Sequence, residues 1–137
     1  MADDNTFRLK IIAPERIFFD EDVNMVELNT SEGEIGILPK HIALTTIVAP
    51  GIMTITKGDE VKEASLLSGF IEVLPDSVTI LAEACEWPDE IDANRANEAK
   101  IRAERRISGG DSSINMDRAE ISLKRALVRL NLAGKYK

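Results

Sequence analysis

The stretch that most constrains the fold is SEGEIGILPKHIALTT, from Ser31 to Thr46. Gly33 and Gly36 permit backbone angles that other residues avoid, and Pro39 lacks the N–H that a central strand must donate. The apolar residues between these glycines and the proline therefore predict a kinked strand that ends in a tight turn. We expect this strand to cross from one sheet to another.

Polar residues around that strand predict an exposed rim. Glu34 precedes the apolar run, and Lys40 and His41 follow it. His41 is the only histidine of the chain, and no cluster of cysteines accompanies it. Because protein zinc sites need several such ligands, we interpret His41 as a surface residue at a turn, and we expect no metal site.

The sequence from residue 7 to residue 83 breaks into short β-type runs. Proline, glycine and aspartate separate the runs, and these residue types favour turns because they restrict the backbone or hydrogen-bond to it. Alternating apolar residues, as in 52–56, are typical of strands with one face in water. The expected strands are Phe7–Ala13, Arg16–Phe19, Val23–Asn29, Ile35–Leu38, Leu44–Val48, Ile52–Thr56, Glu60–Leu67, Phe70–Leu74 and Val78–Ala82.

The character of the sequence changes at Trp87-Pro88. Proline disfavours helix in the residue before it, and the β-type runs end there. Residues 91–107 are mostly strong helix formers and precede Gly109-Gly110, which predicts a helix that ends at these glycines.

A second helix is predicted from Asp117, which caps it together with Glu120, to about Leu132 before Gly134. The short connection between the helices predicts an antiparallel hairpin. The expected fold class is an all-β sandwich or barrel followed by this two-helix hairpin. The expected domains are residues 1–86 and residues 87–137.

Small apolar residues recur along one face of each predicted helix. They let helices approach closely, but they bury little apolar surface, which is worth about 25 cal/mol per Å². A detachable hairpin and one that packs permanently on the sandwich both fit this pattern. The stripes consist of Ala96, Ala99, Ala103 and Ile107 in the first helix and of Ala119, Leu123, Ala126, Leu127 and Leu130 in the second.

Charge is distributed unevenly along the chain, whose formal net charge is -7. Residues 1–88 hold 16 acidic and 6 basic side chains, whereas residues 89–137 hold 8 acidic and 11 basic ones. The acidic part argues against nucleic-acid binding, which needs a basic face. The basic part suits an acidic partner or an anionic ligand.

Motifs of the common enzyme classes are missing. The sequence has no nucleophile elbow, no zinc-protease motif, no Walker loop and no dinucleotide-binding fingerprint. The single Cys85 allows no internal disulfide, which fits a reducing compartment. No run approaches the roughly 20 apolar residues of a membrane helix. We therefore expect a protein that is not an enzyme and does not itself span a membrane.

Arginines at helical spacing indicate either an anion site or a solvated surface. Arg95 and Arg102 lie seven residues apart in the first helix, and Arg125 and Arg129 lie four apart in the second. Both spacings place the pair on one helix face. Four guanidinium groups would bind phosphates if the helices folded together. On spacing alone, weak surface ion pairs with neighbouring carboxylates are favoured.

Three motifs together resemble those of the epsilon subunits of F-type ATP synthases. They are Gly33 to His41, Ser68 to Val73, and Ile91 to Ala96, and the resemblance extends from Phe7 to about Leu132. Ala43 departs from the proline that the family often has at this place.

The resemblance implies a non-catalytic part of the rotor. The β-sandwich would bind the gamma subunit and the c-ring, with Glu34 and His41 at the c-ring contact and gamma on the opposite side. The protein would lie on the cytoplasmic side of a bacterial membrane, held there only through the complex, and would pass proton-driven rotation to the catalytic sector.

The resemblance also implies a nucleotide site. Residues 91–96 match a signature that contacts ATP in some members of the family. No cofactor would be required, and ATP would be a regulatory ligand. The same motif would also arise if Asp92 and Arg95 had a structural role in the first helical turn. The residues that match the family's nucleotide contacts are Glu86, Asp92, Arg95, Arg102, Arg125 and Arg129.

Finally, the resemblance favours a mobile hairpin that inhibits ATP hydrolysis. In its extended state, Lys124, Arg125 and Arg129 would meet an acidic loop of the beta subunit. The alternative is a free-standing β-sandwich module that binds a protein or a carbohydrate. Such modules usually present an aromatic platform, and we expect Phe18-Phe19 and Phe70 to be in the core instead.

Overall fold

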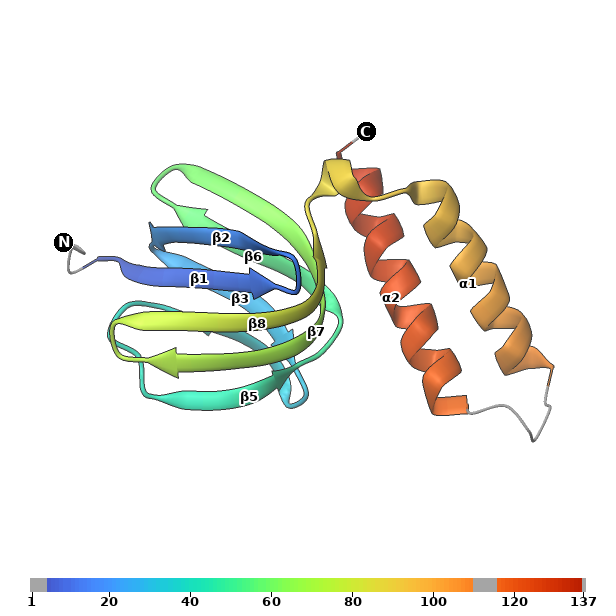
Figure 1. The fold of residues 1–137 in the computed structure, drawn as a ribbon, viewed down its shortest axis with the longest axis horizontal. Coiled ribbons are helices and arrows are strands. Elements are labelled where there is room, and N and C mark those ends of the chain that lie inside the picture. The colour runs from blue at the N-terminus through green and yellow to red at the C-terminus, as the bar shows by residue number, and fades with distance from the viewer. Residues whose placement is uncertain (1–4, 110–115, 137) are drawn as a thin grey trace. The chain divides into compact units, whose positions relative to one another are not determined.

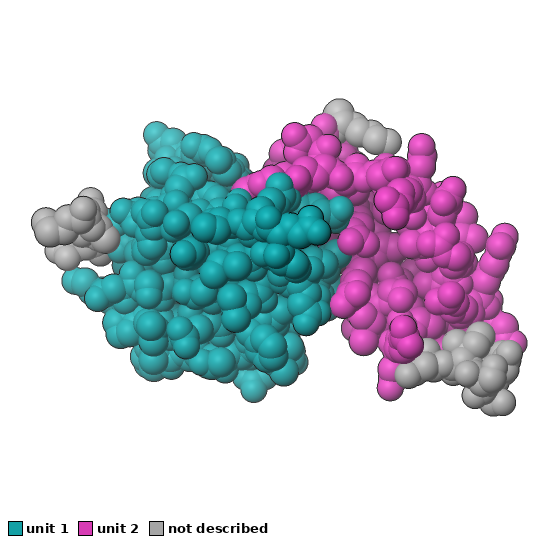
Figure 2. Space-filling model, in the orientation of Figure 1, with its two compact units in different colours: residues 1–86 teal, residues 87–137 magenta. Residues whose placement is uncertain are grey.

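A computed structural model describes residues 5–109 and 116–136. The chain divides into two compact units, residues 1–86 and residues 87–137 (Figure 2). Strands make up the first unit and helices the second (Figure 1). The expected fold class, a β-sandwich followed by two helices, is therefore confirmed.

The β unit folds one continuous sheet over on itself. The strand order is β2-β1-β8-β7-β5-β3-β4, and β6 pairs with both β3 and β7. The β1–β8 ladder is parallel, and the other ladders are antiparallel. The strands are β1 (Phe7–Ala13), β2 (Arg16–Val23), β3 (Met25–Thr30), β4 (Gly33–Ile37), β5 (Leu44–Val48), β6 (Gly51–Lys57), β7 (Glu60–Leu74) and β8 (Ser77–Glu86).

Alternating apolar side chains from all layers form the core of this unit. Leu9 and Ile11 of β1 are fully buried, as is Ile80 of β8, because every second residue of a strand points to the same face. Phe18 and Phe19 are also buried, as expected.

One strand replaces two of the expected ones. The sequence predicted a break at Ser68-Gly69, but β7 runs through it from Glu60 to Leu74. The ladder with β8 shifts register at these residues, and Gly69 has a φ of 142°. The first half of β7 pairs with β6 and the second half with β5. The glycine thus bends a continuous strand and does not end it.

The expected crossing strand is wrong. β4 pairs with β3 from Gly33 to Ile37 and lies at an edge of the sheet. Gly36 has ordinary backbone angles, and a side chain there would press on Met25 at 3.1 Å. The left-handed residue at the exit is Lys40, with a φ of 63°. The bend between layers that we expected here is made by β7.

The helical unit contains η1 (Pro88–Glu90), α1 (Ala93–Ser108) and α2 (Met116–Lys135), and the two α-helices run antiparallel (Figure 1). The predicted small-residue stripe is confirmed at its centre, where Ala96 and Ala103 of α1 and Ala119 and Ala126 of α2 are buried. The expectation for Leu127 is wrong, since it is 39% exposed and Leu132 is buried instead. The remaining stripe residues, Ala99, Ile107, Leu123 and Leu130, are half-buried.

The helix ends differ in detail from the expected ones. Gly109 caps α1 as expected, and its N–H donates to the carbonyl of Arg105. Asp117 lies inside the first turn of α2, and Gly134 lies inside its last turn, so neither marks an end. Most of the predicted connection between the helices, residues 110–115, lies outside the described residues. Within the described ranges, neither helix is both long and apolar enough to cross a membrane.

Candidate functional site

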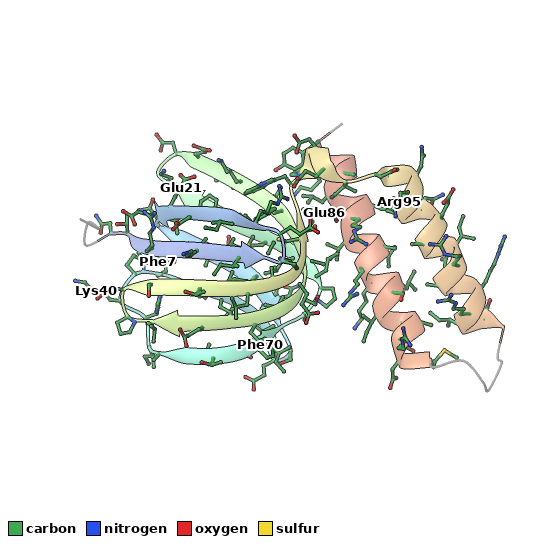
Figure 3. All side chains as sticks on the ribbon, in the orientation of Figure 1. Phe7, Glu21, Lys40, Phe70, Glu86 and Arg95 are labelled. Carbon is green, nitrogen blue, oxygen red and sulfur yellow. The ribbon has the colours of Figure 1, made fainter. Side chains whose placement is uncertain are left out.

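His41 is the least exposed of the predicted rim residues. Both of its ring nitrogens are buried, and neither has a hydrogen-bond partner in the described part of the chain. Its ring contacts Phe7 edge-on, with 5.4 Å between the ring centroids. Figure 3 shows Phe7 and Lys40 toward the same end of the β unit. The expectation of a surface histidine is therefore wrong, because packing of the ring against Phe7 makes the residue half-buried and shields both nitrogens from water.

Burial sets the protonation of this histidine. Desolvation disfavours the charged imidazolium and lowers the pKa of His41. Its own backbone and the Asp76 carboxylate act in the opposite direction without cancelling that effect. His41 is therefore neutral at physiological pH.

Glu34, the other predicted c-ring residue, lies on the outer face of β4 and is exposed. In the ladder between β4 and β3, Glu34 lies opposite Asn29, and Gly36 lies opposite Glu27. These residues line an open groove of about 460 Å³ together with Met25 and others. The structure records no hydrogen bond or ion pair that joins Glu34 to His41 among the described residues.

A row of exposed apolar residues crosses the outer face of the sheet. Register pairing aligns one residue from each of five neighbouring strands, so the row is about 19 Å long at the usual strand spacing. Four of the five side chains are more than half exposed. The apolar row consists of Ile17 (β2), Ile12 (β1), Leu81 (β8), Phe70 (β7) and Ile47 (β5).

Sequence reasoning missed this row. Phe70 was expected in the core, but it is 54% exposed, and Figure 3 labels it on the β unit. The available signal was the pair of adjacent apolar residues at Ile11-Ile12 and at Ile80-Leu81. A strand that is apolar on both faces indicates that something covers its outer face as well.

A polar row borders the apolar row on the same face. It contains both charges and hydroxyls, and it is aligned by the same ladders. Its members are Asp20 (β2), Lys10 (β1), Thr79 (β8), Glu72 (β7) and Thr45 (β5). The polar row therefore separates the apolar row from Leu74, another exposed apolar residue on this face of β7.

In the helical unit, Asp92 has a structural role. Its carboxylate accepts a hydrogen bond from the backbone N–H of Arg95 at 3.1 Å, which caps the N-terminus of α1. Asp92 and Arg95 are thus joined by a hydrogen bond from the Arg95 main chain to the Asp92 side chain, and the Arg95 side chain takes no part in it. This supports the structural interpretation of the motif and leaves the Arg95 side chain exposed for another use.

Replacing the cap gives a modest expected effect. We expect Asp92→Ala to lower the stability of the helical unit by about 1 kcal/mol, since the first turn loses one side-chain acceptor. Asp92→Asn retains an acceptor and serves as the control. Thermal unfolding followed by helical circular dichroism measures both. An equal loss in the two variants would contradict a capping role.

The remaining predicted nucleotide contacts lie in different environments. Arg102 is exposed on α1, whereas Arg125 and Arg129 are half-buried on α2. The Nε atom of Arg125 is buried and has no hydrogen-bond partner within the described ranges. Glu86 ends β8, and its carbonyl accepts a bond from the Ser65 hydroxyl at 3.3 Å. Convergence of these groups on one ligand stays a prediction.

The predicted inhibitory residues share one helix. Lys124 is exposed on α2, and it is adjacent in sequence to Arg125, one turn before Arg129. Their placement gives α2 a basic segment around its middle. Contact with a beta subunit stays a prediction.

Comparison with known proteins relates both units to one family. Residues 6–88 match the family model described as the ATP synthase delta/epsilon chain β-sandwich domain. Residues 89–134 match the model of the long α-helix domain of the same chain.

Whole-chain relatives agree. The ATP synthase epsilon chain of Caldanaerobacter subterraneus subsp. tengcongensis is 47% identical over 97% of this chain and 97% of its own length. That of Halalkalibacterium halodurans is 44% identical over 95% of this chain and 98% of its own.

Solved structures share the fold. A chain of the Euglena gracilis mitochondrial ATP synthase aligns with a TM-score of 0.81 at 23% identity, covering 94% of this chain and 81% of that one. A chain of the Tetrahymena thermophila enzyme aligns at 0.58 and 15% identity, covering 98% and 97%. With both domain models matched in order and relatives near 45% identity over almost the whole length, the chain belongs to the ATP synthase delta/epsilon chain family.

Proposed function

We propose that this non-catalytic subunit works in the central stalk by holding the gamma subunit with its apolar row. The main support for this proposal is that four large apolar side chains of the row are more than half exposed and lie in one line. Contiguous exposed apolar surface of this kind marks interaction sites. A rotor part must transmit torque, and an interface that spans five hydrogen-bonded strands distributes the force over five of the eight strands of the sheet.

The rim of the β unit would face the c-ring. Glu34 is exposed on an edge strand, and it is free to accept hydrogen bonds from a polar loop. His41 would act differently from the expectation, since its buried ring shapes the rim and is not offered to a partner. The chain would then lie at the cytoplasmic face of a bacterial membrane, attached through the complex alone.

The helical unit would act as a brake on ATP hydrolysis. The contact between α1 and α2 is made largely of alanines, which bury little apolar surface and allow rearrangement at low cost. In the extended state, the basic segment of Lys124, Arg125 and Arg129 would bind an acidic loop of the beta subunit.

ATP would oppose the brake. The exposed Arg95 and Arg102 and the unsatisfied Nε of Arg125 are suited to phosphate oxygens. A ligand that binds only the folded hairpin stabilises it by mass action, so inhibition would rise as ATP falls. Glu86 and Arg129 would complete the site.

An add-back experiment tests the brake. ATPase activity is measured for an epsilon-depleted catalytic sector supplied with the intact chain or with a chain that ends after Pro88. We expect both to bind and only the intact chain to inhibit. Inhibition by both would contradict a brake in the helical unit.

A full-length variant provides the matched control. The triple charge reversal Lys124→Glu, Arg125→Glu and Arg129→Glu keeps the helical unit, and we expect it to bind without inhibiting. Full inhibition by this variant would refute the basic contact. If neither chain bound the sector, the free-standing binding module would take the place of the stalk assignment.

A further inference from the structure

We propose that His41 is an acid-sensitive latch, whose protonation releases the rim segment, residues 38–43, from the β unit. The proposal concerns regulation of the docking rim, and it rests on the proposed function only for its consequence in the complex. The latch itself is a property of the isolated chain.

The latch is a half-buried histidine whose two ring nitrogens are shielded from water. Both ring nitrogens are buried and lack hydrogen-bond partners among the residues that the structure describes. The ring packs edge-on against Phe7, which is fully buried in the core of the sandwich. A neutral imidazole already loses hydrogen bonds to water in such a place. An imidazolium would lose more, because its second N–H and its positive charge would also be left unsatisfied.

The charges near the imidazole do not offset that cost. The Asp76 carboxylate, from the β7–β8 turn, favours the cation, but burial has the larger effect on the pKa of His41. Arg8, which follows Phe7 on β1, carries a positive charge that is paired with Asp20 at 2.8 Å. Lys40 is adjacent in sequence and is also positive. Protonation therefore favours moving the ring into water.

The large apolar side chains of the rim segment do not anchor it. Residues 38–43 belong to no strand, and they connect β4 to β5. Ile42 is 88% exposed and Leu38 is 56% exposed, so neither anchors the segment by burial. Lys40 has a left-handed backbone, which a residue with a side chain adopts at some cost. The contact between His41 and the buried ring of Phe7 is thus an anchor that ties the segment to the core of the sandwich.

In the complex, the latch would make docking sensitive to acid. The rim segment follows Glu34 and β4 directly, so its release disturbs the surface that we assign to the c-ring. Acidification near this surface would then weaken attachment at the rim and leave the apolar row unaffected.

Proton NMR of the full-length chain tests the latch directly, because His41 is the only histidine. We expect its imidazole C2 proton to titrate with a midpoint below the usual value of about 6.5. The backbone amides of residues 38–43 should shift with the same midpoint. A midpoint at or above the usual value, or amides that do not follow it, would overturn the proposal.

Two variants separate the latch from a merely structural histidine. Asp76→Asn removes the nearby charge that favours the cation, so we expect the His41 midpoint to move to still lower pH. His41→Gln removes the titrating group, and the amide transition of the rim segment should vanish. If His41→Gln fails to fold, the wild-type chain and Asp76→Asn still decide the matter. An unchanged midpoint in Asp76→Asn would contradict the assigned surroundings.

The unfolding free energy of the chain should also depend on protonation of His41. The folded state holds His41 neutral with a lowered pKa, so the unfolded state binds more protons between the two pKa values. The contribution is complete above about pH 6.5 and is lost as the pH falls through the folded pKa. The urea midpoint of the wild type should therefore fall over this range more than that of His41→Gln. Parallel curves would count against the latch.

Binding to the epsilon-depleted enzyme at pH 7.5 and pH 5.5 tests the consequence. We expect the affinity of the wild type to be lower at pH 5.5 than at pH 7.5. The affinity of His41→Gln should be the same at the two pH values. Equal losses in both would refute regulation by His41. If the chain did not bind at pH 7.5, the proposed function would fail, while the NMR titration would still decide the latch.

Discussion

Replacing Gly69 by alanine should cost the β unit about 3 kcal/mol of unfolding free energy or more. A Cβ atom at this position would lie only 2.1 Å from the backbone carbonyl oxygen of Leu81 on β8. The φ of 142° is in addition a conformation that side chains rarely adopt. The obstacle is backbone within a ladder and not a movable side chain, so β7 or β8 must shift to relieve it. Urea unfolding of the full chain measures the loss.

Gly33→Ala is the matched control for this prediction. Gly33 also has a positive φ, 122°, but nothing lies within 4 Å of the added Cβ. It should therefore show the backbone cost alone, about 1–3 kcal/mol. A loss at Gly69 no greater than that at Gly33 would mean that the close approach to β8 does not matter. Because β7 joins both layers, we also expect the Gly69 variant to lose the whole sandwich cooperatively.

Replacing two members of the apolar row should weaken binding to the gamma subunit about 100-fold. Phe70 and Leu81 are paired neighbours at the centre of the row. Removing a central apolar contact from an interface commonly costs more than 1 kcal/mol, and about 1.4 kcal/mol for each residue gives this factor. We choose Phe70→Thr with Leu81→Thr, since threonine suits a strand and carries no charge. Binding to an epsilon-depleted catalytic sector, followed by sedimentation, provides the affinity.

Glu72→Thr is the corresponding control in the polar row. Glu72 is exposed on the same strand as Phe70 and faces the same side. We expect its replacement to change binding less than threefold. Phe70 and Leu81 are already more than half exposed, so the double variant should keep nearly all of its stability. Wild-type affinity in the double variant would place the gamma contact on another face and defeat the proposal for this row.

The sequence determined the elements whose signals are local. Turn residues between alternating runs predicted most strands, because proline, glycine and aspartate act on their immediate neighbours. Helix formers before Gly109 predicted α1, and the alanine stripe was right at Ala96, Ala103, Ala119 and Ala126. The motif around Asp92 was recognisable for the same reason, since a helix cap involves residues three apart.

Only the tertiary structure decided the features that depend on contacts between residues far apart in the sequence. Gly69 looked like a strand break, and it proved to be a bend, since the pairing of β7 with β8 continues across it while the partner on the other side changes from β6 to β5. His41 looked like a surface residue, but the ring of Phe7, 34 positions away in sequence, covers it. Phe70 looked like core, but it stands on the outer face. Burial is a sum over neighbours that are distant in sequence, and no local pattern contains them.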